Sequence, residues 1–244
     1  MPFTPPAPSN RVQYSLKGRT LQVIVKLANI VLTPSNPRYP GGSWHVEGIA
    51  NESIVATGLY YYACAIITES RLDFRVTVGT EDGPGIEMRY EQYDYRGYMV
   101  AYGVGHEHAL NQPVGHVVAE EDKCVAFPNV YQHRVDAFEL VDKTRPGCRK
   151  ILCFFLVNPV IEILSTTHVP PQQEDWSMDE LEKAPAMQNL PAELFEMVAE
   201  YVKPGVMSRE KAEEHRAELI MERMGFIVEQ REKVYELKFY MCEH

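Results

Sequence analysis

The chain has 244 residues and is 45% hydrophobic, which is enough for one substantial core, alone or with a small appended subdomain. Its 24 Lys and Arg residues are scattered and outnumbered by 34 Asp and Glu, giving a net charge of −10 that disfavours a nucleic-acid partner. No apolar run approaches the roughly 20 residues that span a bilayer, and the N-terminus lacks the pattern of a signal peptide. We therefore expect a soluble cytoplasmic protein with no membrane partner and with reduced cysteines.

After a proline-rich lead of ten residues, the chain is dominated by short runs rich in Val, Ile, Tyr and Phe, separated by Gly, Pro, Asn and Asp. These predicted strands span residues 21–32, 53–62, 71–78, 98–104, 123–130 and 150–157. Many short strands without helical spacers predict an antiparallel sandwich or barrel rather than a parallel α/β sheet.

Beyond residues 169–176 the apolar spacing changes from two to nearly four, which predicts helices. One stripe combines Leu190, Leu194, Met197, Val198 and Tyr201, and Ser208 is a predicted N-cap of the next helix. The predicted organisation is a β core with its N-terminal lead over residues 1–168 and a helical extension over 169–244. We expect this extension to pack on the core or on a partner subunit, in which case the chain forms a homodimer through its C-terminal helices.

A candidate metal site begins with His45 and Glu47, which follow a Pro-Gly-Gly turn. On an extended backbone, residues i and i+2 point to the same face, so both side chains can reach one ion. His133, just beyond the run ending in Phe-Pro-Asn, is a candidate third ligand. Two histidines and one carboxylate on one face of a metal form the facial triad of non-haem Fe(II) oxygenases.

Arg149 heads an apolar predicted strand 16 residues after His133. Its planar guanidinium is suited to pair with the distal carboxylate of 2-oxoglutarate, the 2-oxo acid that such oxygenases bind beside the iron. Arg145 and Lys150 are alternatives for this role. Arg149 is preferred because Arg145 precedes a proline in a predicted loop, and Lys150 should point to the opposite strand face.

His106 and His108 form a second same-face pair. They lie between a Gly-Val-Gly and an Asn-Gln-Pro segment, which predicts a loop. No carboxylate or arginine is placed in the sequence to complete a site with them, so we interpret them as a surface pair.

The combination of HVE, FPNVYQH and GCRKIL resembles the 2-oxoglutarate- and Fe(II)-dependent oxygenase superfamily, in which these ligands and a following Arg or Lys occur in this order. Longer segments resemble the mainly fungal family known as domain of unknown function 4246, from about Ser15 to His244. These segments are SLKGRTLQVIVKLANIVLTP, PRYPGGSWHVEG, ATGLYYY, ITESRLDFR, CVAFPNVYQHRV, VPPQQ and the terminal CEH.

The resemblance implies a mainly β fold with helical additions, built on a double-stranded β-helix (jelly-roll, cupin-like) with a C-terminal helical segment. It implies that His45, Glu47 and His133 are the catalytic metal ligands and that Arg149 binds 2-oxoglutarate. Fe(II), 2-oxoglutarate as co-substrate and dioxygen are the implied cofactors. Glu47 departs from the commoner Asp of the superfamily.

Further cofactor and substrate contacts are also expected from the resemblance. Lys26 and Asn29 lie where relatives often place a second contact to the 2-oxo acid, and their opposite parity lets only one face the cavity. The expected mouth of the site is flanked by four candidate substrate-binding residues, Tyr60, Tyr62, Arg71 and Arg75.

The implied activity is oxidation of a small molecule, such as an amino acid or secondary metabolite, by hydroxylation, desaturation or cyclisation. The alternative function is that of a non-catalytic binding protein on the same scaffold, with a structural or vestigial metal site.

Overall fold

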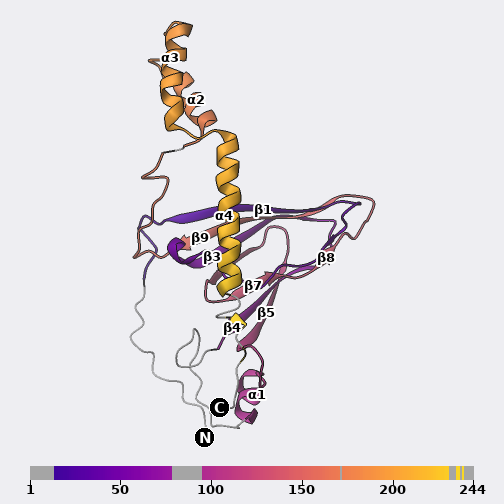
Figure 1. The fold of residues 1–244 in the computed structure, drawn as a ribbon. Helices are drawn as coiled ribbons and strands as arrows, with labels where there is room; N and C mark the ends of the chain where they lie inside the picture. Colours follow the sequence, from indigo (N-terminus) through magenta and orange to yellow (C-terminus); the bar gives the residue numbers. More distant parts are fainter. Residues whose placement is uncertain (1–13, 79–94, 171, 231–234, 237, 239–244) are drawn as a thin grey trace.

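The computed structural model describes residues 14–78, 95–170, 172–230, 235–236 and 238. Within them the chain forms two antiparallel sheets, a short two-stranded ribbon and a set of helices that lie mostly after the strands (Figure 1).

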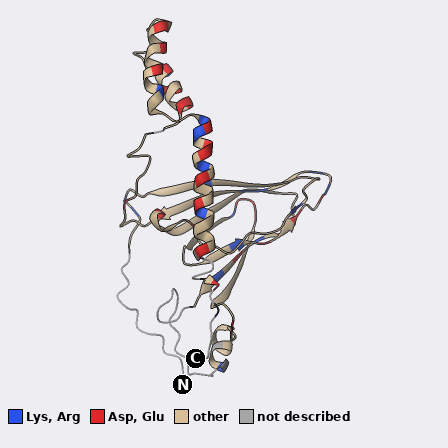
Figure 2. Cartoon of the chain, in the orientation of Figure 1, with Lys and Arg blue, Asp and Glu red and all other residues tan. Residues whose placement is uncertain are grey.

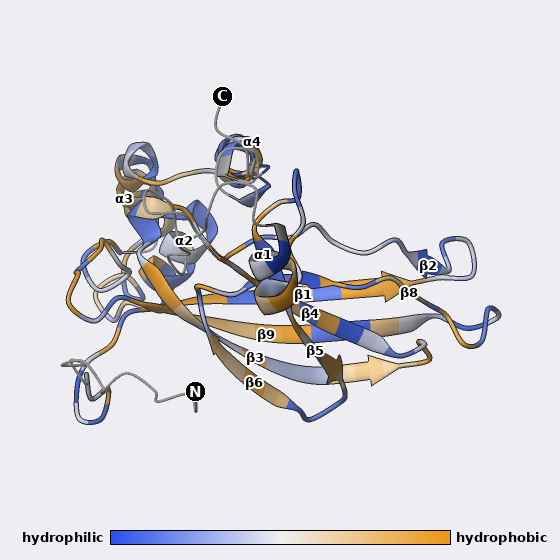
Figure 3. Ribbon diagram, turned by 90° about the horizontal axis from the view of Figure 1, so that it is seen from below, coloured by the Kyte–Doolittle hydropathy of each residue, from blue (hydrophilic) through white to orange (hydrophobic). Residues whose placement is uncertain are grey.

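The larger sheet has four strands in the order β1 (Val23–Leu32), β9 (Gly147–Val157), β3 (Ile54–Ala65) and β6 (Cys124–Pro128). All of its neighbours are antiparallel, and Figure 3 shows the strands side by side in this order. The strand β9, rich in Ile, Leu, Phe and Val, lies between two other strands, as expected for a run that is apolar on both faces.

The smaller sheet has three strands in the order β5 (Asn111–Ala119), β4 (Ser70–Thr77) and β7 (Gln132–Val135). A ribbon of β2 (Arg38–Tyr39) and β8 (Phe138–Glu139) lies beside the sheets. A one-turn 3-10 helix, η1 (Ala50–Glu52), precedes β3.

The main core lies between the two sheets, because its buried side chains come from both. Leu59 on β3 and Phe127 on β6 face Leu72 and Phe74 on β4, and the rings of Phe74 and Phe127 meet edge to face with centroids 4.8 Å apart. A smaller cluster of Leu32, Phe138 and Leu140 packs near the ribbon. The prediction of a mainly β, antiparallel fold is confirmed. The sheets are open in the described part of the chain, so closure into a jelly-roll stays a prediction.

Two predicted details need correction. The run 98–104 is not a strand: α1 (Tyr95–Tyr102) is a helix followed by a loop. A short apolar run without alternation has no period that separates strand from helix, and this one gave the wrong assignment. Conversely, β5 was not among the predicted strands because Pro113 and Gly115 interrupt its pattern. Both residues are tolerated there because β5 is an edge strand.

The predicted helical extension contains α2 (Glu174–Lys183), α3 (Ala192–Val202), the short η2 (Lys203–Gly205) and α4 (Arg209–Gln230). Ser208 caps α4 as predicted, because its hydroxyl accepts a hydrogen bond from the Lys211 amide at 3.3 Å. The helices α2 and α3 stand away from the strands, whereas α4 passes alongside them with mixed charges on its surface (Figures 1 and 2).

Three residues of the apolar stripe on α3 are exposed: Leu194, Met197 and Tyr201 are 47%, 66% and 88% exposed. Packing of the extension on the core or on a partner subunit stays a prediction. Among the residues described, no helix combines the length and apolarity needed to cross a membrane.

Candidate metal centre

Three neighbouring segments place the candidate ligands on one inner surface. His133 of β7 pairs with Phe74 of β4, and an isolated antiparallel bridge pairs His45 with His133. The bridge consists of two backbone hydrogen bonds, from the His45 amide to the His133 carbonyl at 3.2 Å and back at 2.9 Å. The segment around His45 therefore extends the smaller sheet, and both histidine rings project from it, with centroids 4.5 Å apart.

Glu47 completes this group. Its Oε1 lies 3.2 Å from Nε2 of His133 and 3.9 Å from Nε2 of His45. One ligand atom from each of the three residues lies within 4.8 Å of the others. A metal ion about 2.1 Å from each of two adjacent ligands would hold them about 3 Å apart, so the group fits one ion with small adjustments.

Backbone carbonyls orient the histidines for this purpose. Nδ1 of His45 lies 2.8 Å from the carbonyl oxygen of Ser43, and Nδ1 of His133 lies 3.5 Å from that of Tyr131. A neutral ring that donates its Nδ1 proton to a carbonyl keeps its lone pair on Nε2. In both histidines Nε2 is the atom directed at Glu47, so a bound metal would take the place of the Nε2 proton that His133 donates to Glu47 in the metal-free chain.

Burial and charge set the protonation of the group. Burial is the largest influence on His45 and lowers the pKa of its ring, and the nearby His133 and Lys26 lower it further against the opposing charge of Glu47. Burial alone would raise the pKa of the Glu47 carboxyl. The hydrogen bond from His133 and the charges of both histidines and Lys26 outweigh it, so the net pKa lies below its ordinary value. Both shifts favour the metal-binding forms, a neutral imidazole and a carboxylate.

The predicted co-substrate residue, Arg149, lies on the inner face of β9. It shares the strand parity of the core residues Cys153 and Phe155 and is only 2% exposed. Its guanidinium donates one hydrogen bond to the Tyr61 hydroxyl, at 3.3 Å, and lies 5.0 Å from the centre of that ring. Its buried Nε has no hydrogen-bond partner, and no described carboxylate lies within ion-pair distance of it. A buried arginine left this way is costly unless an anion joins it.

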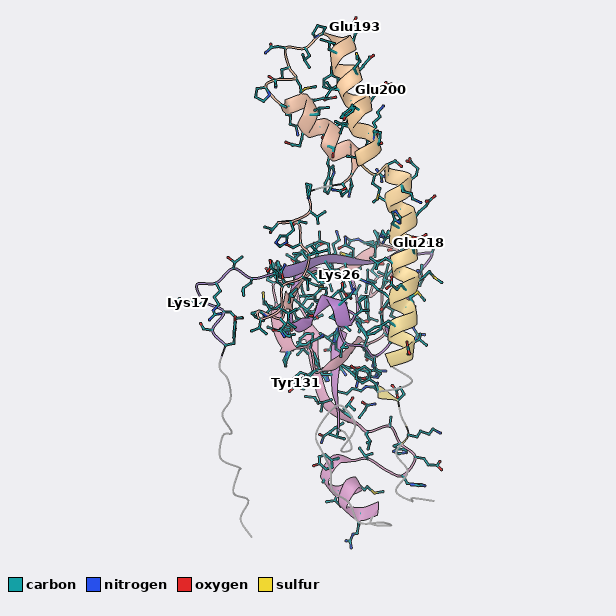
Figure 4. The ribbon with its side chains drawn as sticks, turned by 60° about the vertical axis from the view of Figure 1, so that its left-hand side comes forward. Lys17, Lys26, Tyr131, Glu193, Glu200 and Glu218 are labelled. Carbon is teal, nitrogen blue, oxygen red and sulfur yellow. The ribbon has the colours of Figure 1, made fainter. Side chains whose placement is uncertain are left out.

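The thiol of Cys153 lies on the same inner face of β9 as Arg149. Burial raises the pKa of Cys153 to about 11, and the charges of Lys26, Glu47 and Arg149 also act on it. Lys26 is the register partner of Cys153 on β1. Register partners on neighbouring antiparallel strands point to the same face of a sheet, so Lys26 shares the inner face of the larger sheet with Cys153. Figure 4 shows Lys26 among the side chains of this region.

The structure distinguishes Lys26 from Asn29. Lys26 has the parity of the inward residues Ile24 and Leu32, and its charge acts on both His45 and Glu47. Asn29 lies on the opposite face, where its Oδ1 accepts a hydrogen bond from the Tyr62 hydroxyl at 2.7 Å. Asn29 is therefore not brought to the triad.

The four predicted substrate residues also lie elsewhere. Tyr60 and Tyr62 occupy the outer face of the larger sheet, where Tyr60 bonds Asp122 at 2.8 Å. Tyr61, given no role in the prediction, is the tyrosine that points inward. The structure therefore does not bring Tyr60 and Tyr62 to the triad. Alternation along a strand leaves open which set faces the core, because that depends on the pairing of the whole sheet.

Arg71 and Arg75 share the parity of the outer face of β4, away from the triad. Arg71 forms an exposed ion pair with Glu69. Arg75 bonds Gln132 and Glu236, and its guanidinium lies 4.6 Å from the centre of the Trp44 ring. Arg75 therefore packs on Trp44 at the outer face of the smaller sheet, and neither arginine is brought to the triad.

Two other features lie apart from the centre. His106 and His108 are in a turn before β5, as predicted, and they belong to no metal-compatible group among the described residues. A surface pocket of about 820 Å³ lies between residues 20–25 and 157–168, away from the triad. Asn129 is a further residue of the site: its side-chain amide bonds the backbone of Glu47, a contact that the sequence alone does not predict. It was part of a quoted motif but was given no role.

The arrangement is that of a candidate metalloprotein centre, and comparisons with known proteins place the chain in a family. Residues 3–180 match the family described as "Protein of unknown function (DUF4246)", and the chain belongs to it. The match ends before residues 181–244, so the part of the resemblance traced to His244 is not supported there. The terminal CEH lies outside the described residues.

Solved structures add little. The chain is similar to hydroquinone 1,2-dioxygenase PnpCD, solved in complex with Cd2+ and 4-hydroxybenzonitrile, with 17% identity and a TM-score of 0.28. That match covers 58% of this chain and 62% of the dioxygenase chain. A pilus protein of Bacillus endospore appendages has 7% identity and a TM-score of 0.26, over 62% of this chain and all of the other. Likenesses this weak carry no argument about function. No curated protein matches the chain.

Proposed function

We propose that the chain is an Fe(II)- and 2-oxoglutarate-dependent oxygenase that oxidises a small organic substrate by hydroxylation, desaturation or cyclisation. His45, Glu47 and His133 would hold the iron, and Arg149 would bind the distal carboxylate of 2-oxoglutarate. The proposal combines the ligand group with the family resemblance of the surrounding motifs.

The single observation that carries the proposal is the buried Arg149, which points from the larger sheet into the same core that the triad faces from the smaller sheet and has no ionic partner among the described residues. A metal site alone would suit many functions, including a structural ion. A buried guanidinium without a carboxylate partner needs an anion to balance its charge. Its planar set of N–H donors matches the two oxygens of a carboxylate. An anionic co-substrate that spans from the metal to the arginine meets this requirement.

The donor set fits iron. Two imidazole nitrogens and one carboxylate are the ligands of the facial triad, and three positions of an octahedral ion stay open. When bound there, Fe(II) supplies the place where 2-oxoglutarate and dioxygen react to oxidise a C–H bond. Glu47 offsets part of the positive charge, while the carbonyl-bound Nδ1 atoms of His45 and His133 fix the ring orientations.

The surroundings of the ligands shape access to the site. His133 packs against Phe127 and Phe74, with ring centroids 5.0 and 6.3 Å away, which keeps water from that side. The His45 side chain is 28% exposed, so solvent reaches the triad on this side. Lys26, exposed and inward-pointing, adds positive potential that would attract an anionic co-substrate or substrate.

The proposal is tested by measuring succinate formed from 2-oxoglutarate in air, with and without Fe(II), in wild type and in His133→Ala. Wild type should form succinate only with Fe(II), and His133→Ala should lose at least 99% of this turnover. His116→Ala, which changes an exposed histidine on β5, should keep it.

Equal turnover in His133→Ala and wild type would refute the proposed site. Metal binding without any consumption of 2-oxoglutarate would favour the non-catalytic alternative. A second measurement addresses the arginine: Arg149→Met should raise the KM for 2-oxoglutarate at least 30-fold, whereas Arg71→Met on the outer face should leave it within twofold.

A further inference from the structure

The side-chain amide of Asn129 bonds both the backbone N–H and the backbone C=O of Glu47. Its Oδ1 accepts a hydrogen bond from the Glu47 amide at 2.9 Å, and its Nδ2 donates to the Glu47 carbonyl, also at 2.9 Å. The same Nδ2 donates to the carbonyl of Ile54 at 3.0 Å. One side chain thus satisfies three backbone groups, two of which belong to a candidate metal ligand.

Asn129 is itself firmly placed. It follows β6 directly, and its amide donates to the carbonyl of Val55 at 2.9 Å, which continues the pairing of Pro128 with Ala56 on β3. The larger sheet therefore fixes the position of Asn129. The side-chain hydrogen bonds of Asn129 in turn fix the backbone of Glu47 relative to that sheet.

Glu47 depends on this contact more than the two histidines do. His45 and His133 hold one another through the backbone bridge. Glu47 lies in a bend outside any strand, and among the described residues its amide and carbonyl have no backbone partner. The next residue, Gly48, has φ +78, and a Cβ there would come within 2.6 Å of the Ile54 side chain. The chain thus turns sharply just after the ligand, in a conformation that favours glycine.

We infer that Asn129 is a positioning residue for the metal centre: it fixes the Glu47 peptide so that the carboxylate meets Nε2 of His133 and His45. This inference rests on the metal site of the proposed function and not on the oxygenase chemistry. Partners that orient a metal ligand commonly contribute a factor of 10 to 100 in metal affinity.

The test uses Co(II) as the probe, because its binding can be followed by calorimetry and its visible absorption reports the ligand geometry. The full chain, freed of metal by a chelator, is titrated as wild type, Asn129→Ala and His133→Ala. Wild type should bind one Co(II) and His133→Ala should not. Asn129→Ala should bind 10- to 100-fold more weakly with a changed absorption band, while circular dichroism stays that of the folded protein.

Gln22→Ala is the matched control. The amide of Gln22 also bridges a backbone amide and carbonyl, those of Ile163, at 2.9 and 2.6 Å, but far from the triad. Gln22→Ala should lose about as much thermal stability as Asn129→Ala, but it should keep the wild-type Co(II) affinity and spectrum. This comparison separates positioning of the ligand from general loss of stability.

Asn129→Asp is a second variant in case Asn129→Ala does not fold. It keeps the shape of the side chain and the acceptor for the Glu47 amide, but it places a carboxylate against two carbonyl oxygens. We expect Co(II) affinity to fall at least fivefold. Affinity within twofold of wild type in a folded Asn129 variant would overturn the inference alone. Failure of wild type to bind Co(II) would overturn the metal site and the inference together, and loss of oxygenase turnover with Co(II) binding intact would affect only the proposed function.

Discussion

The strands and the C-terminal helices are built differently. Buried apolar side chains from both sheets form the core, whereas among the described residues of α2, α3 and α4 only Ala199 is buried. The helix α4 reaches the β region through an ion pair between Arg223 and Glu52. The contrast teaches that the stability of the metal centre comes from the packing of the two sheets, and that the helices add to it at few points.

The family match agrees with this division. It spans residues 3–180 and so contains every strand and every candidate ligand, but it ends before α3 and α4. A tail that contributes little buried surface is free to vary without disturbing the core.

The largest expected effect is a direct test of the contrast. Leu72→Ala removes a side chain that is 1% exposed between the sheets and should lower the free energy of unfolding by about 2–5 kcal/mol. Leu194→Ala on α3, where leucine is 47% exposed, should cost less than about 1 kcal/mol. Urea unfolding followed by circular dichroism measures both, and similar losses would break the contrast.

A pair of glycines extends the test to backbone packing. A Cβ at Gly147, at the start of β9, would lie 2.8 Å from the carbonyl oxygens of both Ala65 and Ile66. Gly147→Ala should therefore destabilise the protein by about 1–3 kcal/mol. Gly225→Ala on α4 meets nothing within 4 Å and should leave the stability unchanged or raise it, since alanine favours helix. Equal losses of thermal stability in Gly147→Ala and Gly225→Ala would contradict the difference in packing between the strands and the C-terminal helices.

Within the β region, replacing Arg149 should raise the stability of the ligand-free chain but weaken the binding of 2-oxoglutarate. Arg149→Met removes a buried charge that has no ionic partner among the described residues, and it should raise the free energy of unfolding of the ligand-free chain by about 1–3 kcal/mol. The variant should also lose the thermal stabilisation that 2-oxoglutarate gives the wild type. Arg71→Met, which breaks an exposed ion pair, should change the stability by less than about 0.5 kcal/mol. A destabilised Arg149→Met would show that the arginine is already satisfied without an anion.

The smallest expected effect is the pH dependence of the metal-free chain. The pKa of His45 in the folded protein lies below its ordinary value of 6.5, chiefly through burial. The unfolded chain therefore binds more protons as the pH falls through this value, and stability should decrease between pH 7.5 and 5.5. Glu47 also has a lowered pKa, but its contribution is lost only below its ordinary value of 4.5.

His45→Gln is the variant that checks this prediction. Unfolding in urea at the two pH values should show a smaller decrease in His45→Gln than in wild type. An identical pH dependence in the two proteins would contradict the assignment of the effect to His45.

Local rules predicted much of the site from the sequence. The two-residue spacing of His45 and Glu47 predicted that both side chains share one face, because the geometry of extended chains is regular. The assignment of His133 as the third ligand also rested on the family resemblance. Five of the six strand segments that the analysis identified correspond to strands. Alternation is a reliable signal wherever a strand has one apolar face.

The remaining features depend on distant parts of the chain. The choice of Tyr61 over Tyr60 and Tyr62 as the inward tyrosine follows from the register with β9, which is interrupted between Tyr61 and Ala63. The role of Asn129 depends on a loop more than 80 residues earlier in the chain. Neither pairing changes the order of apolar and polar residues within its own segment, so residue spacing alone could not predict either one.

The bridge between His45 and His133 has a consequence for folding as well as for binding. Glu47 and His133 are separated by 86 residues in the chain, and an ion shared between them would act as a removable cross-link across that span. Because only the folded chain brings the three ligands together, the ion would bind the folded state and stabilise it by mass action. Metal supply in the cell would then set the lifetime of the folded protein as well as the occupancy of its site.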